Sequence, residues 1–148
     1  MRILLQRVSE ASVTVDGEVV GAIDGGLLSF VAAGSGDGPD DLDYCVDKTV
    51  HLRIFEDEEG DMNRSVLDVG GSILAVPQFT LYADVSQGRR PSFFDAMEPG
   101  GAEELFDQYV EALRTFDIER VQTGAFGEMM EVDLVNDGPV TIWIDSDE

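Results

Sequence analysis

Lysine, histidine and cysteine are almost missing from this sequence of 148 residues. Lys48 is the only lysine, His51 the only histidine and Cys45 the only cysteine. One cysteine excludes an internal disulfide framework and is typical of a protein from a reducing cytoplasm. Because no group of histidines and cysteines has the spacing of a zinc site, we expect neither a metal nor another cofactor.

Long hydrophobic runs are also missing. The longest uncharged stretches, such as Gly25 to Gly36, contain glycine and serine and are shorter than the ~20 residues of a membrane span. The N-terminal stretch is charged again at Arg7, which is typical of a strand rather than of a signal peptide. The sequence therefore predicts a cytoplasmic location and no membrane partner.

Positive charge is the third deficit. The chain has 31 Asp and Glu residues against 9 Lys and Arg residues, a formal net charge of −22. The acidic residues are spread along the chain and form no tail. At low ionic strength such a surface repels nucleic acid at long range, and molar salt shortens that repulsion. We interpret the acidity as an adaptation to a high-salt cytoplasm, with an ordinary acidic protein as the alternative.

What the chain does contain is the pattern of one globular domain, expected to span residues 1–148. Hydrophobic residues make up 43% of it, and it has no internal repeat or low-complexity segment. Hydrophobic periodicity predicts about seven strands and two helices, largely antiparallel. The strands are expected at 2–8, 11–15, 18–23, 27–33 and 72–81 and in a last hairpin of 129–134 with 142–144, and the helices at about 42–54 and 101–116.

Two prolines interrupt the apolar runs. Pro77 cannot donate a ladder hydrogen bond, so it marks an edge, an end or a bulge of its strand. The tetrapeptide Asn136 to Pro139 lies between two apolar runs and predicts a hairpin turn. Such a rigid corner, poor in hydrogen-bond donors, could also form one wall of a ligand pocket.

Side chains suited to nucleophilic or acid–base catalysis are scarce. There is no G-x-S-x-G motif. His51 lies in the middle of the first predicted helix, and Cys45 lies on the apolar side of that helix, where it is expected to fill the core. If the protein is an enzyme, it works through backbone groups or through functional groups of its substrate.

Two loops invite a ligand-binding interpretation that their spacing does not support. The glycine-rich loop 34–39 precedes a helix, but Pro39 occupies the place of the third glycine of a dinucleotide-binding fingerprint, and no βαβ repeat is predicted after it. The carboxylates of the acidic loop 55–63 do not have the spacing of an EF-hand. We interpret both loops as plain connections.

Seven segments together closely resemble the D-aminoacyl-tRNA deacylase family, in the family's order and spacing. The resemblance runs from residue 1 to residue 144. The segments are Gln6-Arg7-Val8, Leu52-Arg53-Ile54-Phe55, Met62-Asn63, Pro77-Gln78-Phe79-Thr80-Leu81, Gly88-Arg89-Arg90-Pro91-Ser92-Phe93, Thr123-Gly124-Ala125-Phe126-Gly127 and Asn136-Asp137-Gly138-Pro139-Val140-Thr141.

The resemblance implies a homodimer of mixed α/β subunits, with mainly antiparallel, barrel-like sheets and two flanking helices. It implies hydrolysis of the ester that joins a D-amino acid, or a misplaced glycine, to the 3′ end of tRNA. Gly138-Pro139 would reach with a cis bond into the partner's pocket. The implied catalytic residues are Gln78, Phe79 and Thr80, and the implied substrate-binding residues are Arg7, Pro77, Asn136, Gly138, Pro139 and Thr141.

This activity fits the shortage of catalytic side chains. An aminoacyl ester is already activated, so a positioned water and an oxyanion site can be sufficient. Backbone N–H groups around Gln78 and Phe79 are the candidates for that site, and the adjacent ribose hydroxyl would assist. Thr80 as a nucleophile is the alternative, although no base partner for it is visible.

Chirality would be decided by exclusion, because a rigid backbone wall leaves room only for hydrogen on one side of the α-carbon. One position departs from the family: Pro77 stands where the usual residue is serine, which removes a hydroxyl and a backbone N–H from the pocket floor. Proline here is similar to a related branch with relaxed chiral selection, whereas Phe79 matches the strictly D-specific enzymes.

Arg89 and Arg90 form the densest basic group. They are candidates for contact with phosphates of the tRNA acceptor end, with a solvated turn as the alternative. Two other functions stay open at this point. One is a non-catalytic RNA- or nucleotide-binding module on the same fold, and the other is an unrelated small acidic hydrolase.

Overall fold

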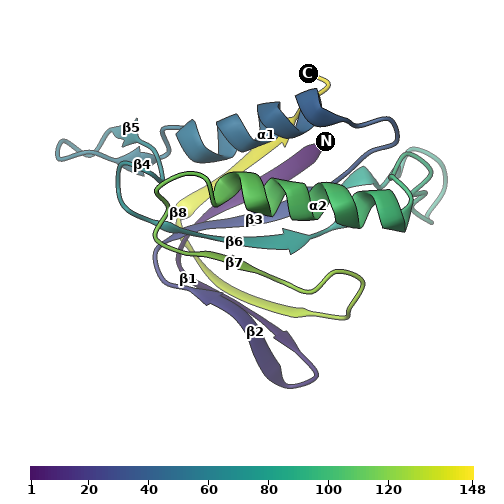
Figure 1. Ribbon diagram of the computed structural model, residues 1–148, viewed down its shortest axis with the longest axis horizontal. Coiled ribbons are helices and arrows are strands. Elements are labelled where there is room, and N and C mark those ends of the chain that lie inside the picture. The colour runs from purple at the N-terminus through teal and green to yellow at the C-terminus, as the bar shows by residue number, and fades with distance from the viewer.

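The computed structural model describes residues 1–148 and shows a curled sheet with two helices on one face (Figure 1). The sheet is organised around β1 (Arg2–Val15), which pairs antiparallel with β2 (Glu18–Ile23), β3 (Gly26–Ala32) and β8 (Glu131–Asp145). The sequence predicted two strands where β1 is continuous. Ser9 and Glu10 interrupt the apolar alternation, but they stay in the strand with exposed side chains.

Two short strands extend the sheet in parallel. β6 (Ser72–Pro77) pairs with β3, and β7 (Val121–Thr123) pairs with β6. Four of the six ladders are antiparallel, so the mainly antiparallel prediction is confirmed. The prediction that no βαβ unit follows residue 39 is wrong, because helices connect both parallel pairs. Buried strands form continuous apolar runs, which carry no sign of strand direction.

The sheet curls until its two ends approach each other, as the barrel-like prediction required. Its strand order is β2-β1-β3-β6-β7, with β8 also paired to β1. A Cβ atom on Gly21 of β2 would lie 2.5 Å from the carbonyl oxygen of Thr123 on β7. A side chain at Gly21 would therefore force the two ends of the sheet apart.

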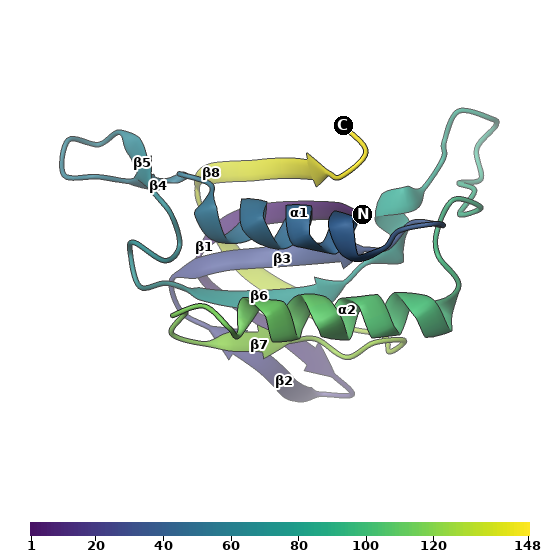
Figure 2. The same ribbon diagram turned by 45° about the horizontal axis from the view of Figure 1, so that its top comes forward.

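The helices α1 (Pro39–His51) and α2 (Pro99–Leu113) cover the same face of the sheet (Figures 1 and 2). Each begins with a proline, which suits the first turn because its missing N–H needs no partner there. The Glu98 carboxylate caps α2, so this helix begins two residues before the predicted start at Gly101. Neither helix is long and apolar enough to cross a membrane.

The apolar core has two parts, one on each side of the sheet. Leu27 and Ile73 pack under the helices, while their neighbours Leu28 and Leu74 point into the curl of the sheet. The buried hydroxyl of Tyr109 on α2 lies within hydrogen-bonding distance of hydroxyls on both β3 and α1. Two helices and the sheet are thus joined by one polar contact inside the core.

A small hairpin and a short 3-10 helix lie outside the predicted set. β4 (Phe55–Glu56) and β5 (Met62–Arg64) form a hairpin of their own around the acidic loop. Its turn is held by the Asp57 carboxylate, which accepts from two backbone N–H groups and from the Asn63 amide. A 3-10 helix, η1 (Phe79–Tyr82), follows β6, so this strand ends at Pro77 and not at Leu81.

The hairpin predicted at Asn136 to Pro139 is absent, because both of its arms pair with β1 and belong to β8. Asn136 pairs with Val8, and Thr141 pairs with Gln6. Four residues of β8, 137–140, therefore lie opposite Arg7 alone and form a bulge, which we call the corner. In a hairpin the two arms would pair with each other, whereas here both arms pair with β1.

Candidate active site

The first candidate segment lies where β6 ends. Pro77 is the last β6 residue paired with β3, and the next N–H, that of Gln78, donates to Val31 O at 2.8 Å. The Gln78 side-chain amide donates to the hydroxyl of Thr80. These bonds fix the direction in which the chain leaves the sheet, and they leave Phe79 and Thr80 exposed to solvent.

The start of η1 supplies free backbone donors. The N–H groups of Phe79 and Thr80 open the helix and have no acceptor within it. The N–H of Gln78 is already bonded to Val31, so the oxyanion candidates move one residue along the chain from those expected. Two adjacent N–H groups at a helix start form a suitable site for a developing negative charge.

The corner is the second candidate segment, and its shape is fixed by its own side chains. Gly138-Pro139 is a cis peptide, and the φ of Gly138 is +147°. The Asn136 amide spans the corner: its oxygen accepts from Val140 N at 2.8 Å, and its nitrogen donates to Val140 O at 3.2 Å. Thr141 accepts from the same amide nitrogen and from Gln6. Asn136 and Thr141 therefore shape the corner from within this chain.

Arg7 supports the corner from below. Its side chain is only 8% exposed, its Nε donates to Asp137 O at 2.8 Å, and its Nη1 donates to Ile54 O at 2.8 Å. The Asp137 carboxylate lies 3.8 Å from Nε. The prediction that Arg7 binds the substrate stays a prediction. Within this chain two of its guanidinium nitrogens donate to backbone carbonyls and hold the corner in position.

The two segments do not meet within one chain. Val31 pairs with Ile3 on one side and with Pro77 on the other, whereas the corner lies opposite Arg7. Four residues along β1 span roughly 13 Å, and three strand spacings of about 4.8 Å separate β6 from β8. Figure 2 shows β8 bending at the end of the sheet opposite the end of β6.

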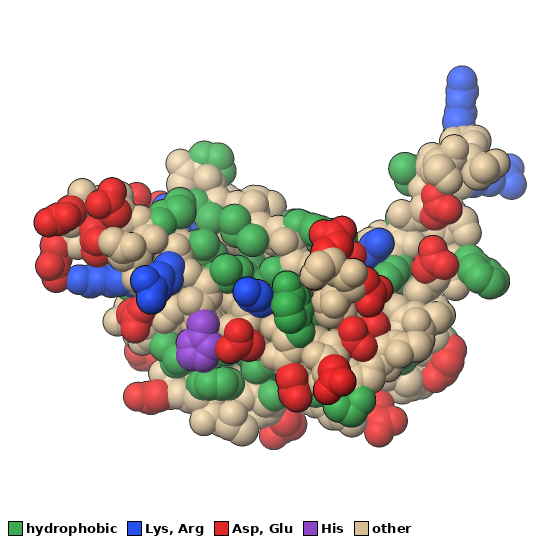
Figure 3. Space-filling view, turned by 90° about the horizontal axis from the view of Figure 1, so that it is seen from above, with side chains coloured by type: hydrophobic (Ala, Val, Ile, Leu, Met, Phe, Trp, Pro, Cys, Tyr) green, Lys and Arg blue, Asp and Glu red, His purple; other side chains and the backbone are tan.

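The basic loop lies beside the first segment. Arg89 and Arg90 are exposed within a connection that is pinned by paired backbone hydrogen bonds between Asp84 and Ser92. The Phe93 ring meets the Phe79 ring edge-on, with centroids 5.1 Å apart. Figure 3 shows basic side chains on a loop that protrudes from the molecule. This loop is therefore anchored to the segment that carries the free N–H groups.

Comparison with known proteins decides the family. The sequence profile of the D-Tyr-tRNA(Tyr) deacylase family matches residues 4–145. The chain belongs to this family. It is 59% identical to the D-aminoacyl-tRNA deacylase of Thermomicrobium roseum over 148 residues, which cover 100% of this chain and 96% of the relative. It is 55% identical to that of a Geobacillus species, covering 100% of this chain and 97% of the relative.

Solved structures show the same deacylase fold. A structure titled "c-Myc DNA Unwinding Element Binding Protein" superposes with a TM-score of 0.93 at 41% identity, covering 98% of both chains. A probable eukaryotic D-amino acid tRNA deacylase superposes with a TM-score of 0.81 at 20% identity, covering 97% of both chains, and supports the fold alone. The chain is thus a hydrolase of the D-aminoacyl-tRNA deacylase family, with aminoacyl-tRNA as its substrate.

Cys45 and His51, which the sequence did not favour as catalysts, both lie outside the two candidate segments. Cys45 is fully buried, and burial raises the pKa of its thiol to about 12. His51 is half-exposed on α1, where its ring meets Phe116 edge-on and its Nε2 lies 3.9 Å from Asp47. Neither contact involves a site residue.

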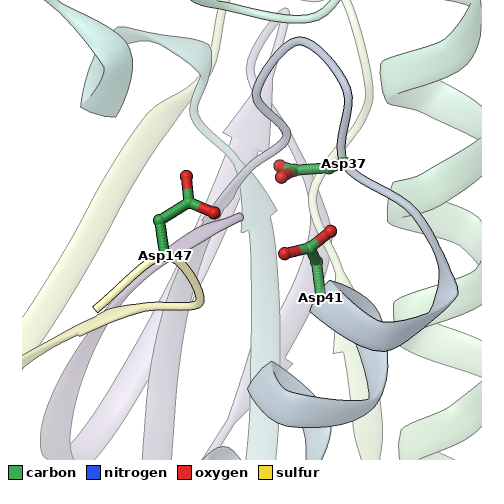
Figure 4. Close-up of side chains that lie close together, drawn as sticks. All are labelled: Asp37, Asp41 and Asp147. Atoms are coloured by element: carbon green, nitrogen blue, oxygen red, sulfur yellow. The ribbon is translucent and has the colours of Figure 1, made fainter.

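Sequence reasoning missed one group of carboxylates, those of Asp37, Asp41 and Asp147 (Figure 4). The buried Met1 ammonium lies 2.7 Å from Asp37 Oδ2 and donates to Ser146 Oγ, which in turn donates to Asp41. Hydrogen bonds from Gly38 N and Ser146 hold the pKa of Asp41 below its usual value. The group joins both ends of the chain to α1. Asp147 lies at the other end of the sequence from Asp37 and Asp41, so no sequence motif reveals the group.

A cleft of about 570 Å³ lies beside the corner and was also missed. Val8, Asp24, Arg120 and Asp137 are among its lining residues, and it includes none of Pro77 to Thr80. The free N–H groups of η1 are therefore not part of this cleft.

Proposed function

We propose that this deacylase hydrolyses D-aminoacyl-tRNA, and misplaced glycyl-tRNA, in a pocket formed by two copies of the chain. One copy supplies the floor, Pro77 to Thr80, and the other supplies the corner as the opposite wall. The observation that carries this proposal is the separation of the two segments within one chain. A homodimer in which each corner reaches across would bring them together twice.

The exposed apolar side chains of β8 support such a dimer. Val135 and Trp143 are 49% and 44% exposed, and Leu134 is 36% exposed. Figure 3 shows hydrophobic side chains gathered on the face that looks towards β8, next to α1. Exposed apolar and aromatic side chains of this kind are typical of a subunit interface. The corner lies on the same strand, so pairing through β8 would carry it to the partner.

Catalysis in this pocket would rest on backbone groups. The N–H groups of Phe79 and Thr80 would stabilise the oxyanion, and a water positioned by the neighbouring ribose hydroxyl would attack the ester. The Thr80 hydroxyl already accepts from Gln78, and no histidine or carboxylate is bonded to it. Gln78 and Thr80 would therefore hold the floor in shape, and Thr80 would not be the nucleophile.

Chiral selection would follow from the rigidity of the corner. Gly138 and Pro139 present backbone without a side chain that could yield, and Asn136 and Arg7 hold them from two sides. A wall of this kind rejects an L-residue by collision at the α-carbon and accepts D-residues of many sizes. Pro77 on the floor removes one N–H and one hydroxyl, and the wall alone would then exclude L-residues.

Arg89 and Arg90 would hold phosphates of the tRNA acceptor end next to the floor. Few contacts are available to a chain with 9 basic residues. The affinity for tRNA should therefore rise at first with salt, as the acidic surface is screened, and then fall less steeply than is usual for RNA-binding proteins.

Hydrolysis of D-, L- and glycyl-tRNA by the purified protein, at low and at molar KCl, tests the activity. We expect D-tyrosyl-tRNA and glycyl-tRNA to be hydrolysed far faster than L-tyrosyl-tRNA. Equal rates for the D and L forms would refute exclusion by the corner. Binding of tRNA without release of the amino acid would identify a binding module in place of an enzyme.

Complementation between two inactive variants tests the shared pocket. Gln78→Ala disables the floor, and Gly138→Val disables the corner. In a heterodimer of the two, one of the two pockets combines an intact floor with an intact corner. Random pairing of co-expressed chains should restore about a quarter of the wild-type activity. If each pocket were built within one chain, the mixture would stay inactive.

A further inference from the structure

Four of the 9 basic side chains of this acidic protein are engaged in ion pairs. Arg7 is buried beneath the corner, Arg2 pairs with Asp145, Arg64 with Glu58, and Arg114 with Glu111. Lys48 and Arg53 have no carboxylate within ion-pair distance. The same holds for Arg89, Arg90 and Arg120, but Lys48 and Arg53 are the two of these five that lie on α1 and directly after it.

Their position is fixed relative to the corner. Arg53 directly precedes Ile54, and the Ile54 carbonyl shares the Arg7 guanidinium with the carbonyl of Asp137. Lys48 lies one turn earlier on α1, where its carbonyl accepts from Leu52 N. The Lys48 ammonium lies 5.5 Å from the centre of the Tyr44 ring, a cation–π contact that holds it on the outer face of the helix.

The surface around Lys48 and Arg53 is suited to binding the phosphate backbone of a nucleic acid. Arg53 is exposed, and Tyr44 is 38% exposed. Figure 3 shows basic side chains over α1 and towards the β4–β5 hairpin, next to the hydrophobic surface assigned above to the dimer interface. Acidic side chains lie around Lys48 and Arg53, so an RNA backbone could approach this surface only along the line that joins the two cations.

We propose that Lys48 and Arg53 bind phosphates of the tRNA whose aminoacyl end lies in the pocket of the partner chain. This inference rests on the proposed function, because a corner that reaches the partner's floor carries Lys48 and Arg53 with it. Each pocket would then have Arg89 and Arg90 on the chain that supplies the floor, and Lys48 and Arg53 on the chain that supplies the wall. Arginine contacts a phosphate with two parallel N–H groups, and lysine contributes a point charge.

The double variant Lys48→Gln/Arg53→Gln tests the contact. Its KM for D-aminoacyl-tRNA should rise roughly tenfold in dilute KCl and converge with the wild-type value as KCl approaches molar, because two phosphate contacts are lost. Its kcat should not change. Hydrolysis of 3′-O-D-tyrosyl-adenosine, which carries the ester but no phosphate, should also be unaffected.

Two controls separate this contact from general charge effects. Lys48→Arg/Arg53→Lys keeps both charges and should keep the wild-type KM within about twofold. Arg114→Gln removes a cation from α2 and should leave the KM unchanged. A double variant whose KM for tRNA equals that of the wild type in dilute KCl would overturn the proposal, as would a parallel loss with the adenosine ester.

The complementing heterodimer shows which chain provides the contact. Placed on the Gln78→Ala chain, which supplies the intact corner, the two substitutions should raise the KM of the restored pocket. Placed on the Gly138→Val chain, which supplies the intact floor, they should have no effect. The reverse result would assign the cations to the floor of their own chain. A wild type inactive on both substrates would defeat the proposed function itself, an outcome distinct from either result.

Discussion

Gly138 is the residue at which the proposed function couples backbone shape most directly to activity. Its φ of +147° suits glycine alone, and a Cβ atom there would lie 2.8 Å from both Val140 Cγ2 and Val140 N. Gly138→Ala should lower the free energy of unfolding by about 1–3 kcal/mol through backbone strain. It should also abolish deacylation of D-tyrosyl-tRNA, because the corner shifts.

Gly60→Ala is the matched control for that substitution. Gly60 has a φ of +85° in the β4–β5 turn, and a Cβ atom there would meet nothing within 4 Å. This variant should lose about 1 kcal/mol of stability and keep full activity. Denaturant unfolding together with deacylation rates separates the two effects. A folded Gly138→Ala protein with wild-type activity would contradict the role of the corner.

Cys45 should be chemically silent in the folded protein. Burial raises its pKa to about 12, whereas an unfolded thiol titrates near 8.5. The folded-state pKa is the higher one, so the stability contributed by the protonated thiol is complete below about pH 8.5 and is lost as the pH rises towards the folded value.

Alkylation by iodoacetamide at pH 9 measures this protection. The native protein should react only at its rate of opening, and the protein in concentrated urea should react at once. Labelling of the native protein at the rate of a free thiol would show that Cys45 is accessible and that the burial argument fails.

At the scale of elements, local sequence predicted where strands and helices lie better than it predicted which strands pair with each other. The continuous run of β3 and the spacing of α1 follow from side-chain periodicity, so both were placed within a few residues. Pairing across the sheet leaves no local signal. The apolar arms around Gly138-Pro139 satisfy a hairpin as well as they satisfy β1, and only the register with Gln6 and Val8 decides between them.

One buried hydroxyl, that of Tyr109, links both helices to β3 by hydrogen bonds. The Tyr109 hydroxyl lies 2.8 Å from Ser29 Oγ and 3.0 Å from Thr49 Oγ1, all of them buried. Tyr109→Phe leaves the Ser29 hydroxyl without its partner and should cost about 1–3 kcal/mol in urea unfolding. Tyr44→Phe, at a partly exposed position on α1, should change stability by less than about 0.5 kcal/mol. Equal effects of the two substitutions would mean that water replaces the lost contact.

At the scale of the whole molecule, the family resemblance implied a pocket divided between two chains, whereas local sequence carries no sign of that division. The segments Pro77 to Thr80 and Asn136 to Thr141 were recognised together, yet nothing in their spacing states that they lie at opposite ends of one sheet. The separation follows from the pairing of β1, because Ile3, which pairs with Val31 of β3, lies four residues from Arg7, which lies opposite the corner. The two carbonyls that the buried Arg7 guanidinium meets, those of Asp137 and Ile54, likewise leave no trace in the sequence.

Net charge is the property of the whole molecule that most affects its stability. With a formal charge of −22, folding brings like charges together, and few cations are free to offset them. Added salt shortens the range of that repulsion from about 10 Å at 0.1 M to about 3 Å at 1 M. The melting temperature should therefore rise steeply with KCl. The protein concentration must be held constant, because the proposed dimerisation would also affect the melting temperature. Tetramethylammonium chloride at equal ionic strength should give the same rise if screening is the cause, whereas a rise with KCl alone would indicate bound potassium. A melting temperature that is flat or lower in molar KCl would leave an ordinary acidic protein, with no adaptation to salt.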